Sequence, residues 1–181
     1  MTSIVSLKQK PTSKVVHILP QKLKAARLRL VEKDRPYFSS LAYGTTFVQV
    51  EGLGTFGVDQ FCRLYFDPAI LDTWTVPEIS AVLGHEYEHV FRRHCDRADS
   101  VLLRHKGPMF QLAMMIWNFA CDAEINDDEK RYRSALPGDP IYPGNLINKV
   151  LLGVLGEEAA KGHARWNEVL PTGKIAEYYF K

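Results

Sequence analysis

The chain has 181 residues, of which 46% are hydrophobic and 24% are charged, and its formal net charge is +2. These values are typical of a globular protein and exclude wholesale disorder and collagen-like repeats. The length suits about one domain and permits a buried core without disulfide bonds. Three cysteines with no CxxC pair argue against both a disulfide framework and a zinc site built from cysteines.

The chain begins with a basic segment. Residues 1–35 carry nine basic and two acidic residues, so their net charge is +7 and that of the remaining residues is −5. We expect residues 1–19 to form a flexible basic arm and residues 20–181 to form a single domain. A basic arm can contact nucleic acid, but most such surfaces are merely solvated. We therefore expect no nucleic-acid partner.

No secretion signal or membrane anchor is expected. The longest apolar stretch near the N-terminus, Val15–Leu19, contains His17 and is much too short for the core of a signal peptide. A transmembrane helix would need a run of about 18 apolar residues, and the sequence contains none. These observations predict a cytoplasmic protein without a membrane partner.

A helix is predicted directly after the arm, and a β-rich stretch follows it. Apolar residues recur at helical spacing from Leu23 to Val31, and Pro36 limits this helix. Runs of β-branched and aromatic residues then predict short strands, with glycines between them and Asp67-Pro68 as the stop. The three runs are Thr45–Val50, Thr55–Val58 and Phe61–Phe66. We expect them to form a small, mainly antiparallel sheet.

Long helices follow the strands. Thr75 and Glu78 have the spacing of a capping box, and Pro77 suits a first helical turn. A helix should therefore begin near Thr75, and it can run to about Arg97. The further predicted helices are residues 108–129, a third around Leu146–Val154 and a short last one after Gly173. The fold class is α+β, with the small sheet packed on long helices that carry the candidate site.

The first long helix contains an HExxH motif, His85-Glu86-Tyr87-Glu88-His89. Residues four apart lie one turn apart on the same face of a helix. His85 and His89 can therefore present two imidazoles to one zinc ion. Zinc lowers the pKa of a bound water molecule, and Glu86 is close enough in sequence to accept its proton.

Helix angles place this histidine pair beside the apolar face of its helix. At about 100° per residue, Leu83, Glu86 and Val90 fall within about 40° of Ile79, with Glu86 at the border. The histidine pair lies at the flank of that face, where a metal ion would be partly shielded from water. The alternative is a helix that carries two exposed histidines and no metal.

A zinc site needs a third protein ligand. His94 is the nearest candidate, but on a continuous helix it points about 180° away from His85. A sharp break after His89 would bring it back, and Val90–Arg93 contains no glycine to make one. We therefore interpret His94 as a packed histidine or one that supports a ligand. Asp96 lies about 10 Å beyond His89 along the helix axis and is therefore too far away to be a ligand.

The second long helix offers Asp122. This helix is apolar almost all round, which predicts burial, but four polar residues follow one narrow stripe: Gln111, Asn118, Asp122 and Asn126. A buried carboxylate needs a partner, often a metal, so Asp122 is the predicted third ligand. Asn118 and Asn126 would orient ligands or hold substrate. Glu124 points about 200° away from Asp122 and is expected on the solvent side. The alternative is an internal polar contact without a metal.

Six segments of the sequence carry a family resemblance. They are Ala25–Arg27, Arg35–Phe38, Leu64–Pro68, Leu83–Glu86 with His89 and His94, Trp117–Asn126, and Ala176–Tyr179. From about residue 20 to its end the chain resembles bacterial and phage metallopeptidases whose zincin-like domain often precedes a von Willebrand factor A-like domain. The WN-x-A-x-D-x-x-IN segment is more distinctive than HExxH. The resemblance implies a zinc-dependent peptidase fold with Asp122 as third ligand. Because the sequence contains no von Willebrand-like domain, a separate partner protein is expected in its place.

These residues lead to two functional hypotheses. In the first, the protein is a zinc metallopeptidase in which His85, His89 and Asp122 hold zinc, although another divalent ion would also suit these ligands. A zinc-activated water attacks the peptide bond, with Glu86 as general base and then proton donor to the leaving amine. The peptide or protein substrate would lie as an added strand at the sheet edge near Phe61–Phe66. Candidate donors to the oxyanion are Tyr87, Tyr142 and Tyr178. In the second hypothesis the same fold is a metal-binding regulatory or assembly module without turnover.

Overall fold

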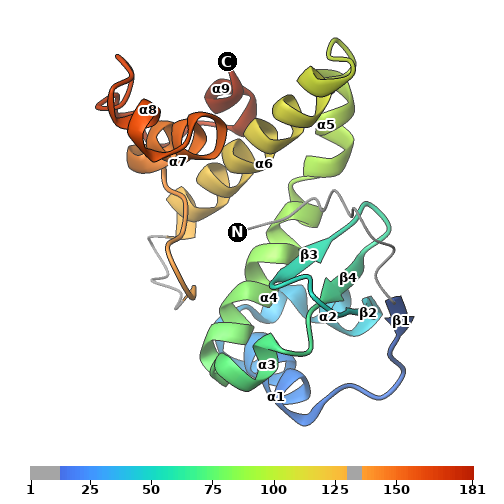
Figure 1. Ribbon diagram of the computed structural model, residues 1–181. Helices are drawn as coiled ribbons and strands as arrows, with labels where there is room; N and C mark the ends of the chain where they lie inside the picture. The colour runs from blue at the N-terminus through green and yellow to red at the C-terminus, as the bar shows by residue number, and fades with distance from the viewer. Residues whose placement is uncertain (1–12, 130–135) are drawn as a thin grey trace. The chain divides into compact units, whose positions relative to one another are not determined.

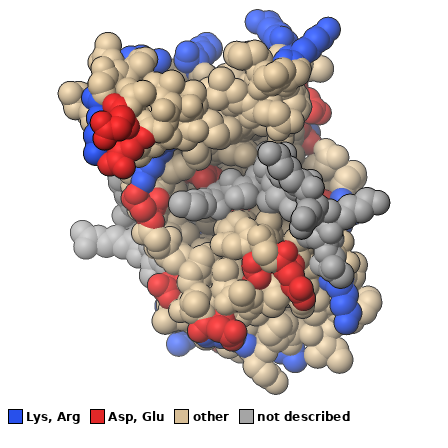
Figure 2. All heavy atoms as spheres, viewed as in Figure 1, with Lys and Arg blue, Asp and Glu red and all other residues tan. Residues whose placement is uncertain are grey.

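The computed structural model describes residues 13–129 and 136–181, and it divides them into two compact units. The first unit holds residues 13–96 and 136–138, and the second holds residues 97–129 and 139–181. The first carries a small sheet and several helices, whereas the second is helical (Figure 1). The chain is therefore a mixed α+β protein, as predicted, while the single domain over residues 20–181 stays a prediction. On the face drawn in Figure 2, basic and acidic side chains are scattered among uncharged ones.

Four short strands form the sheet of the first unit. They are β1 (Ser13–Val15), β2 (Thr46–Val50), β3 (Phe56–Val58) and β4 (Arg63–Phe66), in the spatial order β1-β2-β4-β3. β1 with β2 and β3 with β4 are antiparallel, whereas β2 with β4 is parallel. The sheet is thus small and mainly antiparallel, as predicted. Ser13–Val15, which we expected in the flexible arm, instead pair with Val48–Val50. The β-branched Val15 and Val16 favour this extended backbone.

Two helices of the first unit, α1 and α4, begin where local signals predicted them, whereas α2 and α3 were not predicted. They are α1 (Gln21–Arg29), α2 (Ser39–Gly44), α3 (Ile70–Thr73) and α4 (Val76–Phe91), with a π-helical turn η1 (Leu30–Asp34) and a 3-10 turn η2 (Pro36–Phe38). The predicted capping box of α4 is present. The backbone N–H of Glu78 donates to Thr75 Oγ1 over 3.4 Å, and the Thr75 N–H donates to the Glu78 carboxylate over 2.7 Å.

The middle of α4 lies in the core of the first unit. Ile79, Leu83 and Tyr87 are fully buried and belong to the same apolar cluster as Leu23 of α1 and Phe66 of β4. β3 lies beside α4 (Figure 1). All α4 residues from position 79 to position 89 are buried. The HExxH turn is therefore enclosed, and its polar side chains need partners other than bulk water.

α4 ends earlier than the sequence predicted. We expected a continuous helix to about Arg97, but α4 stops at Phe91 and α5 (His94–Leu102) starts after a two-residue break. Arg93 adopts a left-handed backbone with φ of +57°. Glycine usually occupies this position at a helix end because other residues strain there. The prediction was wrong because the lack of a glycine disfavours such a break without preventing it.

The second unit is built from α6 and the helices that follow it. Besides the rest of α5, its helices are α6 (Pro108–Glu129), α7 (Pro143–Leu155), α8 (Glu157–Lys161) and α9 (Ala176–Phe180). The bounds of α6 agree with the predicted residues 108–129. Trp117 and Cys121 of α6 are buried in one apolar cluster with Leu146 of α7 and Tyr179 of α9. Within residues 13–129 and 136–181, none of the helices combines the length and the apolar character that a membrane crossing requires.

Candidate functional site

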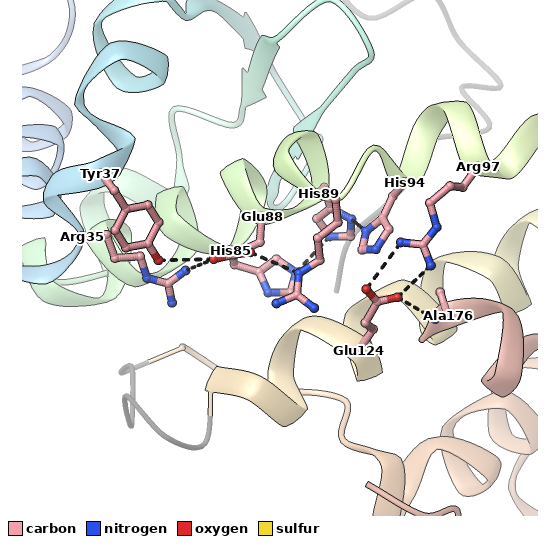
Figure 3. A network of polar contacts seen from close by, with 10 residues as sticks. Arg35, Tyr37, His85, Glu88, His89, His94, Arg97, Glu124 and Ala176 are labelled. Atoms are coloured by element: carbon pink, nitrogen blue, oxygen red, sulfur yellow. Dashed lines mark hydrogen bonds and ion pairs between the residues drawn. The ribbon is translucent and has the colours of Figure 1, made fainter. Parts of the chain in front are cut away.

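The two histidines of the HExxH motif face each other on α4. His85 and His89 are both buried, and their Nε2 atoms are 3.1 Å apart (Figure 3). Two nitrogen ligands bonded to one tetrahedral metal ion at about 2.1 Å would be about 3.4 Å apart. The pair therefore already has the spacing of two ligands that share an ion. The alternative of two exposed histidines is wrong, because only 6% and 7% of these residues are exposed.

Glu86 is also enclosed. It follows His85 directly and is only 2% exposed. Its place in α4, next to the first histidine and three residues before the second, keeps its carboxylate on the same turn of helix as the pair. A general base must lie within hydrogen-bond reach, directly or through one water, of the proton that it takes. The buried position of Glu86 in this turn is compatible with that requirement.

His94 does contact the histidine pair. The break at Arg93 turns the chain so that His94 Nδ1 lies 3.0 Å from His89 Nδ1, and His94 is buried. His89 thus has one ring nitrogen beside His85 and the other beside His94 (Figure 3). The expectation that His94 points away from the pair assumed a continuous helix and was wrong. Its interpretation as a packed or supporting histidine agrees with this contact.

A charged cluster that no sequence pattern predicted lies on the neighbouring face of α4. Glu88 accepts hydrogen bonds from Arg35 Nη1 over 3.3 Å, from Arg92 Nε over 3.1 Å and from the Tyr37 hydroxyl over 3.4 Å. Arg35 also lies against the backbone of Gly84. One signal in the sequence was available, since a glycine inside a helix is unfavourable and often marks a close contact.

Tyr87 does not qualify as a donor to the oxyanion. It is fully buried in the apolar cluster of the first unit, and its ring packs edge-on against Phe38 with centroids 5.8 Å apart. Burial raises the pKa of its hydroxyl to about 12. Tyr87 is therefore a packing residue. Tyr142 and Tyr178 belong to the second unit and stay candidates.

In the second unit, α6 buries two of the four residues of the predicted polar stripe. Asp122 and Asn126 are buried, while Asn118 is half-buried. The Asn126 amide donates to the Ile141 carbonyl over 2.8 Å. Asn126 therefore holds the start of the segment that leads into α7. The C-terminal part of the stripe is therefore buried, as its position on an apolar helix predicted, whereas Gln111 at its other end is exposed.

The prediction for Glu124 was wrong. We expected it on the solvent side of α6, but it is only 7% exposed. Its carboxylate accepts hydrogen bonds from Arg97 Nη2 over 3.0 Å and from the Ala176 backbone N–H over 2.5 Å (Figure 3). Arg97 also pairs with Glu177 and lowers the pKa of that carboxyl. The predicted direction of Glu124 on α6, away from Asp122, does not make it exposed, because α9 covers the face that we assigned to solvent.

The predicted strand position for a substrate also needs correction. β4 lies inside the sheet, between β2 and β3, so the stretch Phe61–Phe66 does not form an edge. The edge strands of the described sheet are β1 and β3, and β3 is the one beside α4. The order of strands depends on pairing between segments, which the sequence pattern does not reveal.

The three predicted metal ligands, His85 and His89 in the first unit and Asp122 in the second, are all buried. Two imidazoles and one carboxylate form a donor set that suits several divalent transition metals. The 3.1 Å spacing of the two Nε2 atoms fits such an ion as well. The chemistry of these three residues therefore suits a divalent metal ion.

Comparison with known proteins gives a family. A family model described as "putative metallopeptidase domain" matches residues 19–168. Neither the curated proteins nor the solved structures include a match to this chain. The matched range contains both the HExxH helix α4 and all of α6.

Proposed function

Since the chain belongs to this metallopeptidase-domain family, we propose that it is a zinc-dependent peptidase that hydrolyses peptide or protein substrates. One observation carries the proposal most directly. His85 and His89 are buried with their Nε2 atoms 3.1 Å apart, and Glu86 lies buried in the same turn of α4. This combination of residues suits metal-assisted hydrolysis of an amide bond.

In this proposal His85, His89 and Asp122 hold the ion. When bound, zinc supplies Lewis acidity, which lowers the pKa of a water molecule and polarises a carbonyl group. Glu86 accepts the proton from the attacking water on its carboxylate and then donates it to the leaving amine. Burial of Glu86 keeps competing water away from that carboxylate.

Three further residues have supporting roles in the proposal. If His89 uses Nε2 as a ligand, the proton of its neutral ring is on Nδ1, which can donate to His94 Nδ1 at 3.0 Å. Such a bond fixes the orientation and the tautomer of a ligating histidine. Asn118 and Asn126 would orient ligands or hold substrate. The hydrogen bond from the Asn126 amide to the Ile141 carbonyl favours a role in holding the chain around α6.

The substrate is proposed to add as a strand to the outer edge of β3 (Phe56–Val58). β3 is the edge strand beside α4, and edge strands can pair with an extended peptide. A cytoplasmic location and a separate partner protein are part of the same proposal and rest on the sequence analysis alone.

The test combines metal content with peptide cleavage. The purified full chain is analysed for bound metal by mass spectrometry and is then incubated with a broad peptide library. We expect about one zinc per chain and cleavage in the wild type, retained zinc but loss of cleavage in Glu86→Gln, and loss of zinc in His85→Ala. The exposed Glu32 offers a matched control, since Glu32→Gln should leave both properties unchanged.

Two outcomes would overturn parts of this proposal. Zinc retained in His85→Ala would show that the metal site is assigned to the wrong residues. Zinc bound in the wild type with no cleavage of any peptide would favour the alternative, a metal-binding regulatory or assembly module without turnover.

A further inference from the structure

Three residues of α4 form a row beside the face that carries His85 and His89. This row, which we call the seam, consists of Ser80, Gly84 and Glu88, which are four residues apart and therefore follow one face of the helix. All three contact the short segment after α1. The Ser80 hydroxyl donates to Asp34 Oδ2 over 2.7 Å, while Gly84 and Glu88 both contact the side chain of Arg35.

Gly84 allows Arg35 to lie directly on the helix backbone. A Cβ atom at position 84 would be 3.2 Å from both Cζ and Nε of Arg35 and 3.3 Å from Cδ1 of Leu30. These separations are tighter than ordinary van der Waals contact, so any larger residue would push the guanidinium away. Gly84 immediately precedes His85. The contact therefore lies at the turn that carries the first histidine.

Glu88 anchors the other end of the same guanidinium. Arg35 Nη1 donates to Glu88 Oε1 over 3.3 Å, and the two side chains are only 6% and 11% exposed. Tyr37 donates to the same carboxylate (Figure 3), and so does Arg92. A buried ion pair contributes little net stability compared with apolar residues, but it can select one geometry. Here it spans the helical turn from residue 84 to residue 88.

The backbone that presents Arg35 is itself constrained. The Arg35 N–H donates to the Leu30 carbonyl over 2.6 Å and closes the π-helical turn η1. Pro36 follows and restricts the preceding residue to extended conformations, in agreement with the φ of −149° and ψ of 75° at Arg35. Contacts within its own segment thus fix the backbone of Arg35, in addition to its side-chain contacts with α4.

We propose that Arg35, through Gly84 and Glu88, is a positioning residue that sets the rotation of α4 about its axis and thereby aims His85 and His89 at the metal. This inference rests on the proposed function, because it requires the pair to bind an ion. Side-chain tips lie about 5–6 Å from a helix axis, so a rotation of 10° moves them by about 1 Å. Metal–ligand distances tolerate only about 0.2 Å. A seam that limits rotation would therefore control metal affinity.

The experiment measures metal binding by the full chain and does not depend on turnover. Zinc affinity is determined by competition with a chelator of known affinity, and the absorption spectrum of the cobalt-substituted protein reports ligand geometry. We expect Arg35→Lys and Glu88→Gln to weaken zinc binding by about 10- to 100-fold and to change the cobalt spectrum. Gly84→Ala should weaken binding as well, although alanine is the better helix former.

Two controls separate positioning from general destabilisation. Arg63→Lys makes the same chemical change at an exposed arginine whose ion pair with Asp59 lies in the β3–β4 hairpin. Leu64→Val weakens the core of the first unit away from the seam. Both controls should bind zinc within about twofold of the wild type.

The inference is overturned if Arg35→Lys and Gly84→Ala bind zinc with wild-type affinity and give the wild-type cobalt spectrum. It is also overturned if Leu64→Val, at an equal loss of thermal stability, weakens binding as much as Arg35→Lys. Failure of the proposed function is distinct from both results. In that case the wild type would bind no zinc, or His85→Ala would bind it unchanged.

Discussion

Replacing Glu124 by alanine should destabilise the second unit, although the sequence places this residue toward solvent. The substitution removes the acceptor of the Ala176 N–H, at 2.5 Å, and one of the two carboxylates that pair with Arg97. Removing one partner of a fully buried ion pair costs about 3–5 kcal/mol. Arg97 is 25% exposed and keeps Glu177, so solvent and the second carboxylate reduce that cost. An unsatisfied buried N–H costs about 1–3 kcal/mol.

Together these considerations predict a loss of about 2–3 kcal/mol for Glu124→Ala. For a chain of this size, each kcal/mol lowers the melting temperature by about 2–4 °C, so a fall of about 5–10 °C is expected. Glu124→Gln keeps an oxygen acceptor for the Ala176 N–H and should cost about 1 kcal/mol. Glu158, which is exposed on α8, provides the control, since Glu158→Ala should change stability by less than about 0.5 kcal/mol.

Hydrogen exchange locates the effect within the unit. Amides of residues 174–181 should exchange faster in Glu124→Ala, because the bond from Glu124 to Ala176 anchors the start of α9. Amides of α1 serve as the internal reference. If Glu124→Ala has the melting temperature of the wild type and leaves amide exchange in residues 174–181 unchanged, then Glu124 lies on the surface and our account of this face of α6 is refuted.

Three further predictions concern a helix cap, an ion pair and the metal. Thr75→Ala should lower the free energy of unfolding, measured in urea, by about 1 kcal/mol, because it removes the Thr75 hydroxyl from the capping box with Glu78. An unchanged urea midpoint would contradict this. Arg97 lowers the pKa of Glu177, so this pair stabilises the fold above the unfolded pKa of about 4.3. That contribution is lost as the pH falls through the lowered folded value, so the melting temperatures of wild type and Glu177→Gln should converge in acid; a constant difference down to pH 3 would speak against it. Zinc at 100 times its dissociation constant should stabilise the protein by about 2.7 kcal/mol, and a chelator should reverse this, whereas His85→Ala should respond to neither.

Elements with signals close together in sequence were the ones that could be predicted. Pro108 starts α6 as a proline at a first turn does, and Thr75 with Glu78 starts α4. The buried histidine pair belongs to this class too, because spacing of four residues and an adjacent apolar stripe are both local properties. Such patterns determine the type of an element and the direction of its side chains.

Contacts between distant segments could not be derived in the same way. Arg35 and Glu88 are 53 residues apart, and Arg97 and Glu124 are 27 apart, so no periodicity links them. Glu124 illustrates the consequence. The helical wheel gave its direction correctly, but only the packing of α9 on α6 decides whether that direction is solvent or protein. The interior place of β4 in the sheet depends on pairing with β2 and β3 for the same reason.

The break after α4 shows how a local rule can fail at the candidate site itself. A left-handed backbone costs a residue with a side chain about 1–2 kcal/mol, and Arg93 adopts it without being glycine. The strain persists only if neighbouring contacts hold the chain in place. Arg93 Nε lies 2.8 Å from Asp96 Oδ2, but both side chains are largely exposed, and such pairs are weak. The buried contact of His94 with His89, at 3.0 Å, is therefore the stronger reason for the break. On a continuous helix His94 would lie away from His89, so the break is what allows the contact between these two histidines of the candidate site.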